Sequence, residues 1–188
     1  MDDDSAPRVK NIVINALLES FYDILDRDGR NSILRAAGTP ELMDAQLDPR
    51  EYTDYEVFNK IIDAMNLLLQ FSEFIAYEIG RKFAIYSDPS GNGIRAIIQN
   101  LQEWIQTGWT IEVIREDPES QEMVIKVENC PFCGTCKEAG SCGAVTCDFL
   151  RGIFSMSLEK TSRQAVACLE HDHVFTLMMD KGGETNNG

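Results

Sequence analysis

The sequence is short of positive charge. Its 188 residues include 17 Lys and Arg against 31 Asp and Glu, which leaves a formal net charge of −14 at pH 7. A surface that binds nucleic acid or anionic lipid headgroups needs an excess of basic side chains to neutralise phosphates. We therefore expect no nucleic-acid partner.

The sequence also lacks a long uninterrupted apolar run. Its most hydrophobic region, residues 67–83, is broken by Gln70, Glu73, Glu78, Arg81 and Lys82, whereas a membrane-spanning helix needs ~20 predominantly apolar residues. The N-terminus, Met-Asp-Asp-Asp-Ser-Ala-Pro, is acidic where an export signal would be basic and then apolar. These features predict no membrane span and a cytoplasmic location.

Cysteine is absent from the first 129 residues and then occurs at six positions: Cys130, Cys133, Cys136, Cys142, Cys147 and Cys168. A disulfide framework would distribute its thiols across the fold. Thiols crowded together in a reducing compartment more often serve metal or redox chemistry.

The first half of the sequence predicts helices. Apolar residues recur at three-and-four spacing over residues 9–25, 53–83 and 94–105, and the long middle segment is expected to be one central helix. Asp28-Gly29 is expected to end the first helix, and a shorter helix should follow over 31–37. The stretch 38–49 contains two prolines and is expected to be a loop with at most one helical turn.

Beyond Gly108 the apolar spacing changes to a period of two. Residues 109–114 and 123–127 predict a β-hairpin, and a helix over 144–160 and a second hairpin of 164–169 and 173–179 follow. This order predicts an α+β fold in which N-terminal helices pack on an antiparallel sheet made of two hairpins with an intervening helix. Residues 8–180 are expected to form one domain, helical over 8–107 and cysteine-rich α/β over 108–180, between disordered tails at 1–7 and 181–188.

The cysteine spacing predicts a metal site. Cys130, Cys133 and Cys136 form two overlapping Cys-x-x-Cys steps, and two intervening residues let both sulfurs reach one ion. We expect Zn²⁺, and an iron–sulfur cluster is the alternative, because the spacing overlaps part of a ferredoxin motif. Reversible disulfide switching and inert thiols are the other interpretations of the same residues.

Further ligands are expected near the C-terminus. Cys147 should lie in the first turn of its helix, where the helix dipole favours the thiolate. Cys168 and His173 should lie opposite each other across a loop of residues 169–172, so that both reach one ion. The predicted metal ligands are therefore Cys147, Cys168, His173, Cys130, Cys133, Cys136 and Cys142.

Part of this region resembles a known family. The chain contains the string Ser141-Cys142-Gly-Ala-Val-Thr-Cys147-Asp-Phe-Leu-Arg-Gly152-Ile-Phe, followed by Cys168 and His173-Val-Phe175. This pattern resembles the C-terminal signature of the 4-vinyl reductase domain family, also called hydrocarbon-binding proteins. The segment from Gly29 to Gly38 looks like its N-terminal motif, so the likeness covers most of the chain.

The resemblance implies a fold shared with TRAPP transport-complex subunits and haem nitric-oxide sensor domains, a small-molecule pocket and a homodimer. It also implies a zinc beside the pocket, at positions that map to Cys147, Cys168 and His173. The family's glutamate is replaced here by Ala165, so one of the remaining thiols would have to complete the site.

The sequence nominates no acid/base pair and no Ser-His-Asp set. We therefore expect a metal-binding domain that binds or senses a small apolar or aromatic ligand, without catalytic activity of its own. One alternative is a cysteine-based redox or iron–sulfur module that senses oxidant or transfers electrons. The other is a dimeric interaction scaffold.

Overall fold

The computed structural model describes residues 6–69, 72–87, 93–120, 122–132, 144–159, 165–170 and 174–179. In chain order the elements are β1 (Arg8–Lys10), α1 (Asn11–Ala36), the 3-10 helix η1 (Pro40–Met43), β2 (Tyr52–Asp54), α2 (Tyr55–Leu69), α3 (Glu73–Ser87), α4 (Ile94–Trp104), β3 (Ile105–Gln106), β4 (Thr110–Asp117), β5 (Glu122–Glu128), α5 (Ala144–Glu159), β6 (Ala165–Glu170) and β7 (Val174–Met179).

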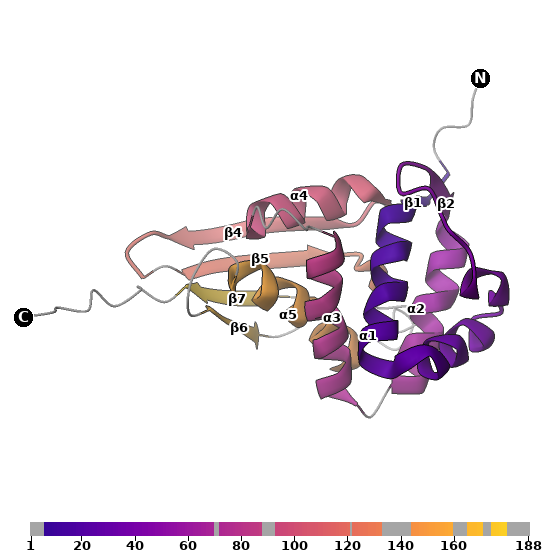
Figure 1. Ribbon diagram of the computed structural model, residues 1–188. Coiled ribbons are helices and arrows are strands. Elements are labelled where there is room, and N and C mark those ends of the chain that lie inside the picture. Colours follow the sequence, from indigo (N-terminus) through magenta and orange to yellow (C-terminus); the bar gives the residue numbers. More distant parts are fainter. Residues whose placement is uncertain are drawn as a thin grey trace, which may run out of the picture.

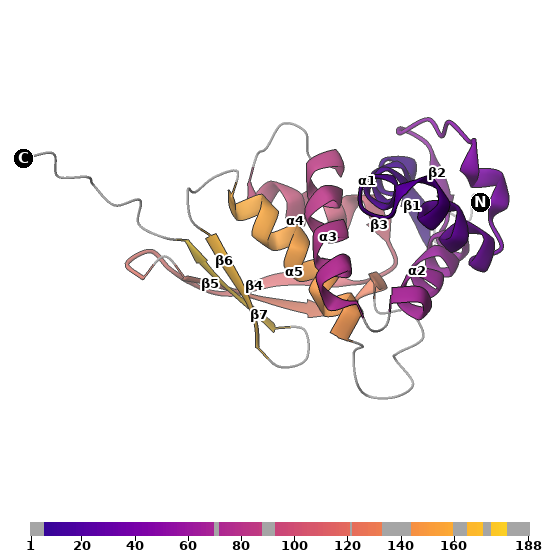
Figure 2. The same cartoon turned by 60° about the horizontal axis from the view of Figure 1, so that its bottom comes forward.

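Within these ranges the strands form two antiparallel sheets. A three-stranded sheet has the order β2-β1-β3, and a four-stranded sheet has the order β4-β5-β7-β6. Helices α3, α4 and α5 lie over one face of the larger sheet, whereas α1 and α2 lie beyond its end (Figure 2). The expected α+β fold, with a helix between two hairpins, is confirmed.

Helix α3 is the central helix, because it packs on α1 on one side and on α5 on the other (Figure 1). Two glycines let α3 and α5 approach until their backbones touch. A Cβ built on Gly80 would lie 2.0 Å from the carbonyl oxygen of Phe149, and one built on Gly152 would lie 2.1 Å from that of Tyr77. Each glycine thus faces the backbone of the other helix, and close packing there leaves no room for a side chain.

Aromatic rings fill the core between these helices and the start of β4. The Phe132 ring lies at their centre, with its centroid 4.9 Å from Phe149, 5.8 Å from Phe58, 5.9 Å from Trp109 and 6.2 Å from Phe83. All five side chains are buried. Tilted and edge-on aromatic pairs at these separations stabilise a core beyond the area that they bury.

Two expectations for the helices are wrong. The segment 53–83, expected to be one helix, is divided between α2 and α3. Ser72 marks the start of α3, because its carbonyl accepts hydrogen bonds from the backbone N–H groups of Ile75 and Ala76, at 3.0 and 3.1 Å, and serine is favoured at such N-terminal cap positions. The helices expected over 9–25 and 31–37 are the two halves of α1, and they meet at Asp26 instead of Asp28-Gly29.

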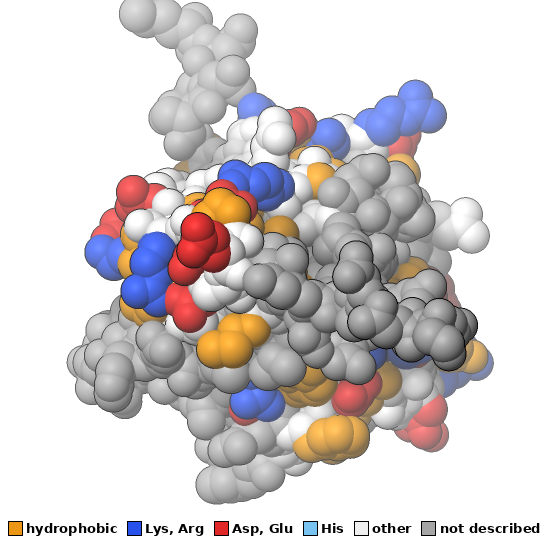
Figure 3. Space-filling view, turned by 90° about the vertical axis from the view of Figure 1, so that its left-hand side faces the viewer, with side chains coloured by type: hydrophobic (Ala, Val, Ile, Leu, Met, Phe, Trp, Pro, Cys, Tyr) orange, Lys and Arg blue, Asp and Glu red, His pale blue; other side chains and the backbone are white. Residues whose placement is uncertain are grey.

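The surface at the tip of the β4–β5 hairpin carries both signs of charge. Arg95 pairs with Glu116, and Arg115 pairs with Glu122. Figure 3 looks onto this end of the molecule and shows basic and acidic side chains close together. Among the described helices, none combines the length and the apolarity that a membrane crossing requires.

Candidate functional site

A sharp bend divides α1. Asp26 has φ 62° and ψ −172°, a conformation that residues other than glycine rarely adopt. Its Oδ1 accepts hydrogen bonds from the backbone N–H groups of Asp28 (2.8 Å) and Gly29 (3.1 Å), so it caps the second half of the helix. A Cβ on Gly29 would lie 2.5 Å from that of Leu25, which explains why glycine stands where the chain turns.

Beside this bend, both halves of α1, η1 and the segment after it enclose a pocket of ≈ 290 Å³. Two side-chain hydrogen bonds hold its wall in place: Asn15 Nδ2 donates to the carbonyl of Leu47 (2.9 Å), and Arg30 Nη2 donates to that of Met43 (3.1 Å). The polar lining is Asn15, Glu19, Arg30 and Gln46, and the apolar lining is Leu18, Leu42, Met43, Ala45 and Leu47.

The pocket contains a cation and an anion that do not pair with each other. Arg30 is half-buried, donates weakly to Asn31 Oδ1 (3.4 Å) and lies over the ring of Tyr22, 5.6 Å from its centroid. Within the described part of the chain, its guanidinium contacts no carboxylate. Glu19 is exposed and has neither a hydrogen bond nor an ion pair among the same residues. Both charges are thus available to a ligand.

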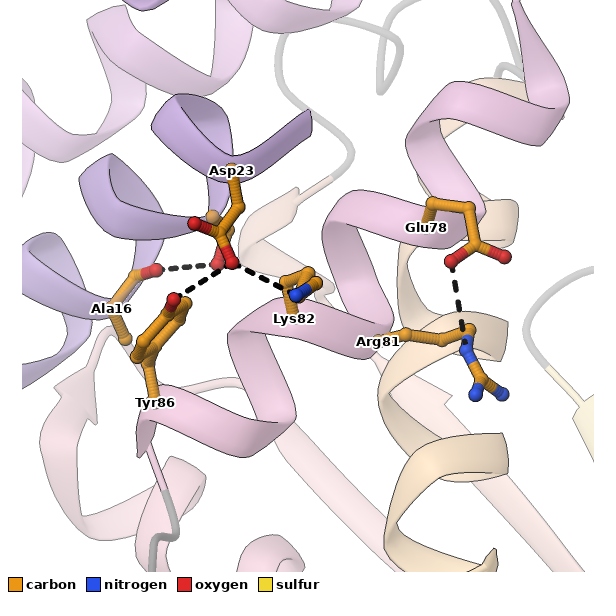
Figure 4. A network of polar contacts seen from close by, with 7 residues as sticks. Ala16, Asp23, Glu78, Arg81, Lys82 and Tyr86 are labelled. Carbon is orange, nitrogen blue, oxygen red and sulfur yellow. Dashed lines mark hydrogen bonds and ion pairs between the residues drawn. The ribbon is translucent and has the colours of Figure 1, made fainter. Parts of the chain in front are cut away.

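A polar cluster joins the first half of α1 to α3 just before the bend (Figure 4). Asp23 Oδ2 accepts hydrogen bonds from Lys82 Nζ and from the hydroxyl of Tyr86, both at 2.8 Å. The bond from Lys82, followed by that from Tyr86, lowers the pKa of Asp23, and the hydrogen bond to this carboxylate raises the pKa of Tyr86. The cluster therefore joins the first half of α1, which also lines the pocket, to the central helix.

The structure describes few of the side chains predicted to bind metal. Cys130 is 3% exposed and lies in the hydrophobic core with Phe132. Cys147 lies in the first turn of α5 and Cys168 in β6, as expected, but only their backbone is described. The other predicted ligands, Cys133, Cys136, Cys142 and His173, lie outside the described residues, so their assignment stays a prediction.

The expected pairing of Cys168 with His173 is wrong. Strand β6 continues to Glu170, which pairs with Val174, and the register places Cys168 opposite Thr176. The two strands are therefore longer than the sequence pattern indicated. The connection between them consists of residues 171–173 instead of 169–172.

Sequence reasoning missed the pocket. Its residues come from α1 and from the segment 38–49, which was expected to be a loop with at most one helical turn and contains the short helix η1. The hydrogen bonds from Asn15 and Arg30 to this segment join residues that only the fold brings together. No local pattern marks them as neighbours.

No protein-family model matches the chain, and no curated protein matches it in sequence. Solved structures of H-NOX domains are similar in fold. A doubly substituted H-NOX domain has 13% identity and a TM-score of 0.58, with 91% of this chain and 95% of that chain covered. An H-NOX domain described as oxygen-binding and related to soluble guanylate cyclases, in its oxygen complex, has 14% identity and a TM-score of 0.55, with 89% and 91% covered. A third structure, from work on heme redox potential and porphyrin distortion, has 13% identity and a TM-score of 0.57, with 91% and 95% covered.

These findings overturn the expected cofactor. The similar structures are described in terms of heme and oxygen, and not of zinc or an iron–sulfur cluster. Among the described residues, no group of three His, Cys, Asp or Glu side chains could hold a metal ion. The expectation of Zn²⁺, with an iron–sulfur cluster as the alternative, is therefore wrong. The fold shared with haem sensor domains is confirmed, whereas no family model supports the 4-vinyl reductase family in particular.

The described residues do not fit a haem either. A haem in the core would need the space that Phe132 and the four rings around it occupy. The likeness to H-NOX domains therefore shows the fold of this chain, and not its cofactor.

Proposed function

We propose that this chain is a small-molecule sensor or binding domain without catalytic activity, and that its ligand occupies the pocket beside the bend of α1. The observation that carries the proposal is the composition of the pocket, in which an apolar wall is combined with two charged side chains that have no oppositely charged partner among the described residues. Small-molecule sites typically have such a wall and a few polar groups that orient the ligand. The fold of an oxygen-binding H-NOX domain supports the same class of function.

The contacts around the pocket indicate how binding could be transmitted. A ligand would touch both halves of α1, and the first half is joined to α3 through Asp23 and Lys82. A sensor needs two conformations between which the ligand discriminates. We expect the bend at Asp26 to differ between them, because its backbone is held in a sparsely populated conformation.

Thermal unfolding in the presence of a panel of small molecules tests the proposal. A ligand at 100 times its Kd stabilises the folded state by about 2.7 kcal/mol, which is roughly 5–10 °C in Tm for a domain of this size. The variant Ala45→Trp places a large ring on the pocket wall and should abolish the shift.

Ala36→Trp is the matched control, because Ala36 is an exposed alanine at the end of α1 and lies outside the pocket lining. This variant should keep the ligand-dependent shift. The proposal fails if no member of the panel moves Tm, or if both tryptophan variants respond like the unchanged protein.

A further inference from the structure

We infer that the pocket beside the α1 bend takes a small zwitterion with an apolar side chain, of the class of an aliphatic α-amino acid. The inference rests on the proposed function and names its ligand. Its basis is the presence of one cation and one anion, Arg30 and Glu19, in the lining of the same pocket.

The surroundings of Arg30 favour a carboxylate group on the ligand. Its side chain is half-buried, yet in the described part of the chain it meets only the carbonyl of Met43, the side-chain oxygen of Asn31 and the ring of Tyr22. A partly buried charge without a counter-ion is costly. The two N–H groups on Arg30 Nη1 donate to no described residue, and the planar guanidinium matches the geometry of a carboxylate.

The negative charge of Glu19 favours an ammonium group on the ligand. A ligand that carried a carboxylate alone would place a second negative charge in a pocket that already contains the Glu19 carboxylate. A ligand that carried an amine alone would place a second positive charge beside that of Arg30. Repulsion between like charges weakens the binding of both kinds of ligand, whereas a molecule with both groups offers each residue an opposite charge.

The remaining wall selects an apolar side chain of limited size. Leu18 and Leu42 are buried, and Met43 and Leu47 are partly buried against the core. A volume of ≈ 290 Å³ is at the lower end of the range for small-molecule sites, about 300 Å³. A branched aliphatic amino acid such as leucine therefore represents the class.

Calorimetric titration of the full chain with three matched compounds tests the inference. L-Leucine carries both charges, 4-methylpentanoate lacks the ammonium group, and 3-methylbutylamine lacks the carboxylate. We expect leucine to bind at least about tenfold more tightly than either analogue, because each lost charge leaves one protein charge without its hydrogen-bonded partner. Equal binding of the three compounds would overturn the inference.

Three variants assign the two charges. Arg30→Gln should remove the preference for leucine over the amine, and Glu19→Gln should remove the preference over 4-methylpentanoate. Arg35→Gln is the control, because Arg35 is exposed on the same helix outside the lining, and it should leave both preferences unchanged. Among the described residues, Glu19 is exposed and makes no hydrogen bond whose loss could unfold the protein, so Glu19→Gln keeps the test decisive if Arg30→Gln fails to fold.

The two proposals fail separately. If other compounds bind in a manner that Ala45→Trp abolishes, while leucine has no advantage over its analogues, the ligand class is wrong and the sensor function stands. If neither leucine nor any other compound binds, both proposals are wrong.

Discussion

Replacing Gly80 by alanine should destabilise the protein strongly, although alanine is the better helix former. Helix propensity alone predicts a gain of about 1 kcal/mol for this change in a helix interior. The new Cβ, however, would lie 2.0 Å from the carbonyl oxygen of Phe149, whereas ordinary contact begins at 3.4 Å. A backbone atom cannot rotate away, so α3 and α5 must separate by about 1.4 Å, the difference between these distances.

A gap of that size removes much of the dispersion energy between the atoms that face it. We therefore expect a loss of about 3 kcal/mol, at the upper end of the range for overpacked cores, and a fall in Tm of roughly 6–12 °C. Gly152→Ala should cause a similar loss of stability, because its Cβ would lie 2.1 Å from the carbonyl oxygen of Tyr77.

Urea unfolding followed by circular dichroism measures all three variants. The double variant Gly80→Ala/Gly152→Ala should lose clearly less than the sum of the two single losses, because one methyl group already separates the helices and makes room for the other. A Gly80→Ala protein as stable as the parent, or more stable, would refute the close contact. A loss in the double variant equal to the sum of the two single losses would show that the two methyl groups do not act through the same separation of α3 and α5.

Four other measurements test the structure. Asp26→Ala should lower the free energy of unfolding in urea by about 1–2 kcal/mol, because it removes the helix cap and leaves the positive φ. Asp26→Asn should keep the free energy of unfolding within about 0.5 kcal/mol of the parent. Equal losses in the two variants would contradict the cap. Because the folded-state pKa of Asp23 lies below its ordinary value of 3.8, this carboxylate contributes stability above about pH 4 that is lost as the pH falls through the folded pKa. Asp23→Asn should remove about 1 kcal/mol or less of that dependence, and an unchanged acid profile would count against the cluster. Added haemin should produce no Soret band of a haem-bound protein, and such a band would show that the core accepts a porphyrin. Light scattering should give the mass of a homodimer, and the mass of one chain would contradict the resemblance on this point.

The sequence pattern predicted the larger elements because their periodicity persists over many residues. Both hairpins, α4 and α5 follow from it. The short helix η1 instead lies in the segment whose two prolines predicted a loop with at most one helical turn. The strands β1, β2 and β3 have only two or three residues each, which is too few for a period of two to be recognised.

The division between α2 and α3 was missed for the opposite reason. Apolar residues continue at helical spacing through the break, and this periodicity outweighed the local signal from Ser72. The bend in α1 was placed two residues late because Asp28-Gly29 is the stronger turn dipeptide. The structure instead uses Asp26 for the bend and Gly29 for clearance beside Leu25.

The candidate site could not be derived from the sequence. Arg30 and Glu19 lie on one helix, and only the bend between them and the packing of η1 create a pocket. The crowded cysteines gave the more conspicuous pattern, and they led to a cofactor that the comparisons contradict. Phe132, within the same Cys-x-x-Cys segment, instead occupies the centre of the core.

The backbone contact between α3 and α5 limits which motions the domain can make. Two helices separated by side chains can slide, since the side chains adopt new rotamers, but helices in contact at Gly80 and Gly152 have no side chains there to rearrange. Together they form a rigid frame on the sheet. A conformational change that starts at the α1 bend would then move α1 against this frame, with the ion pair between Asp23 and Lys82 as the contact that resists or releases the movement.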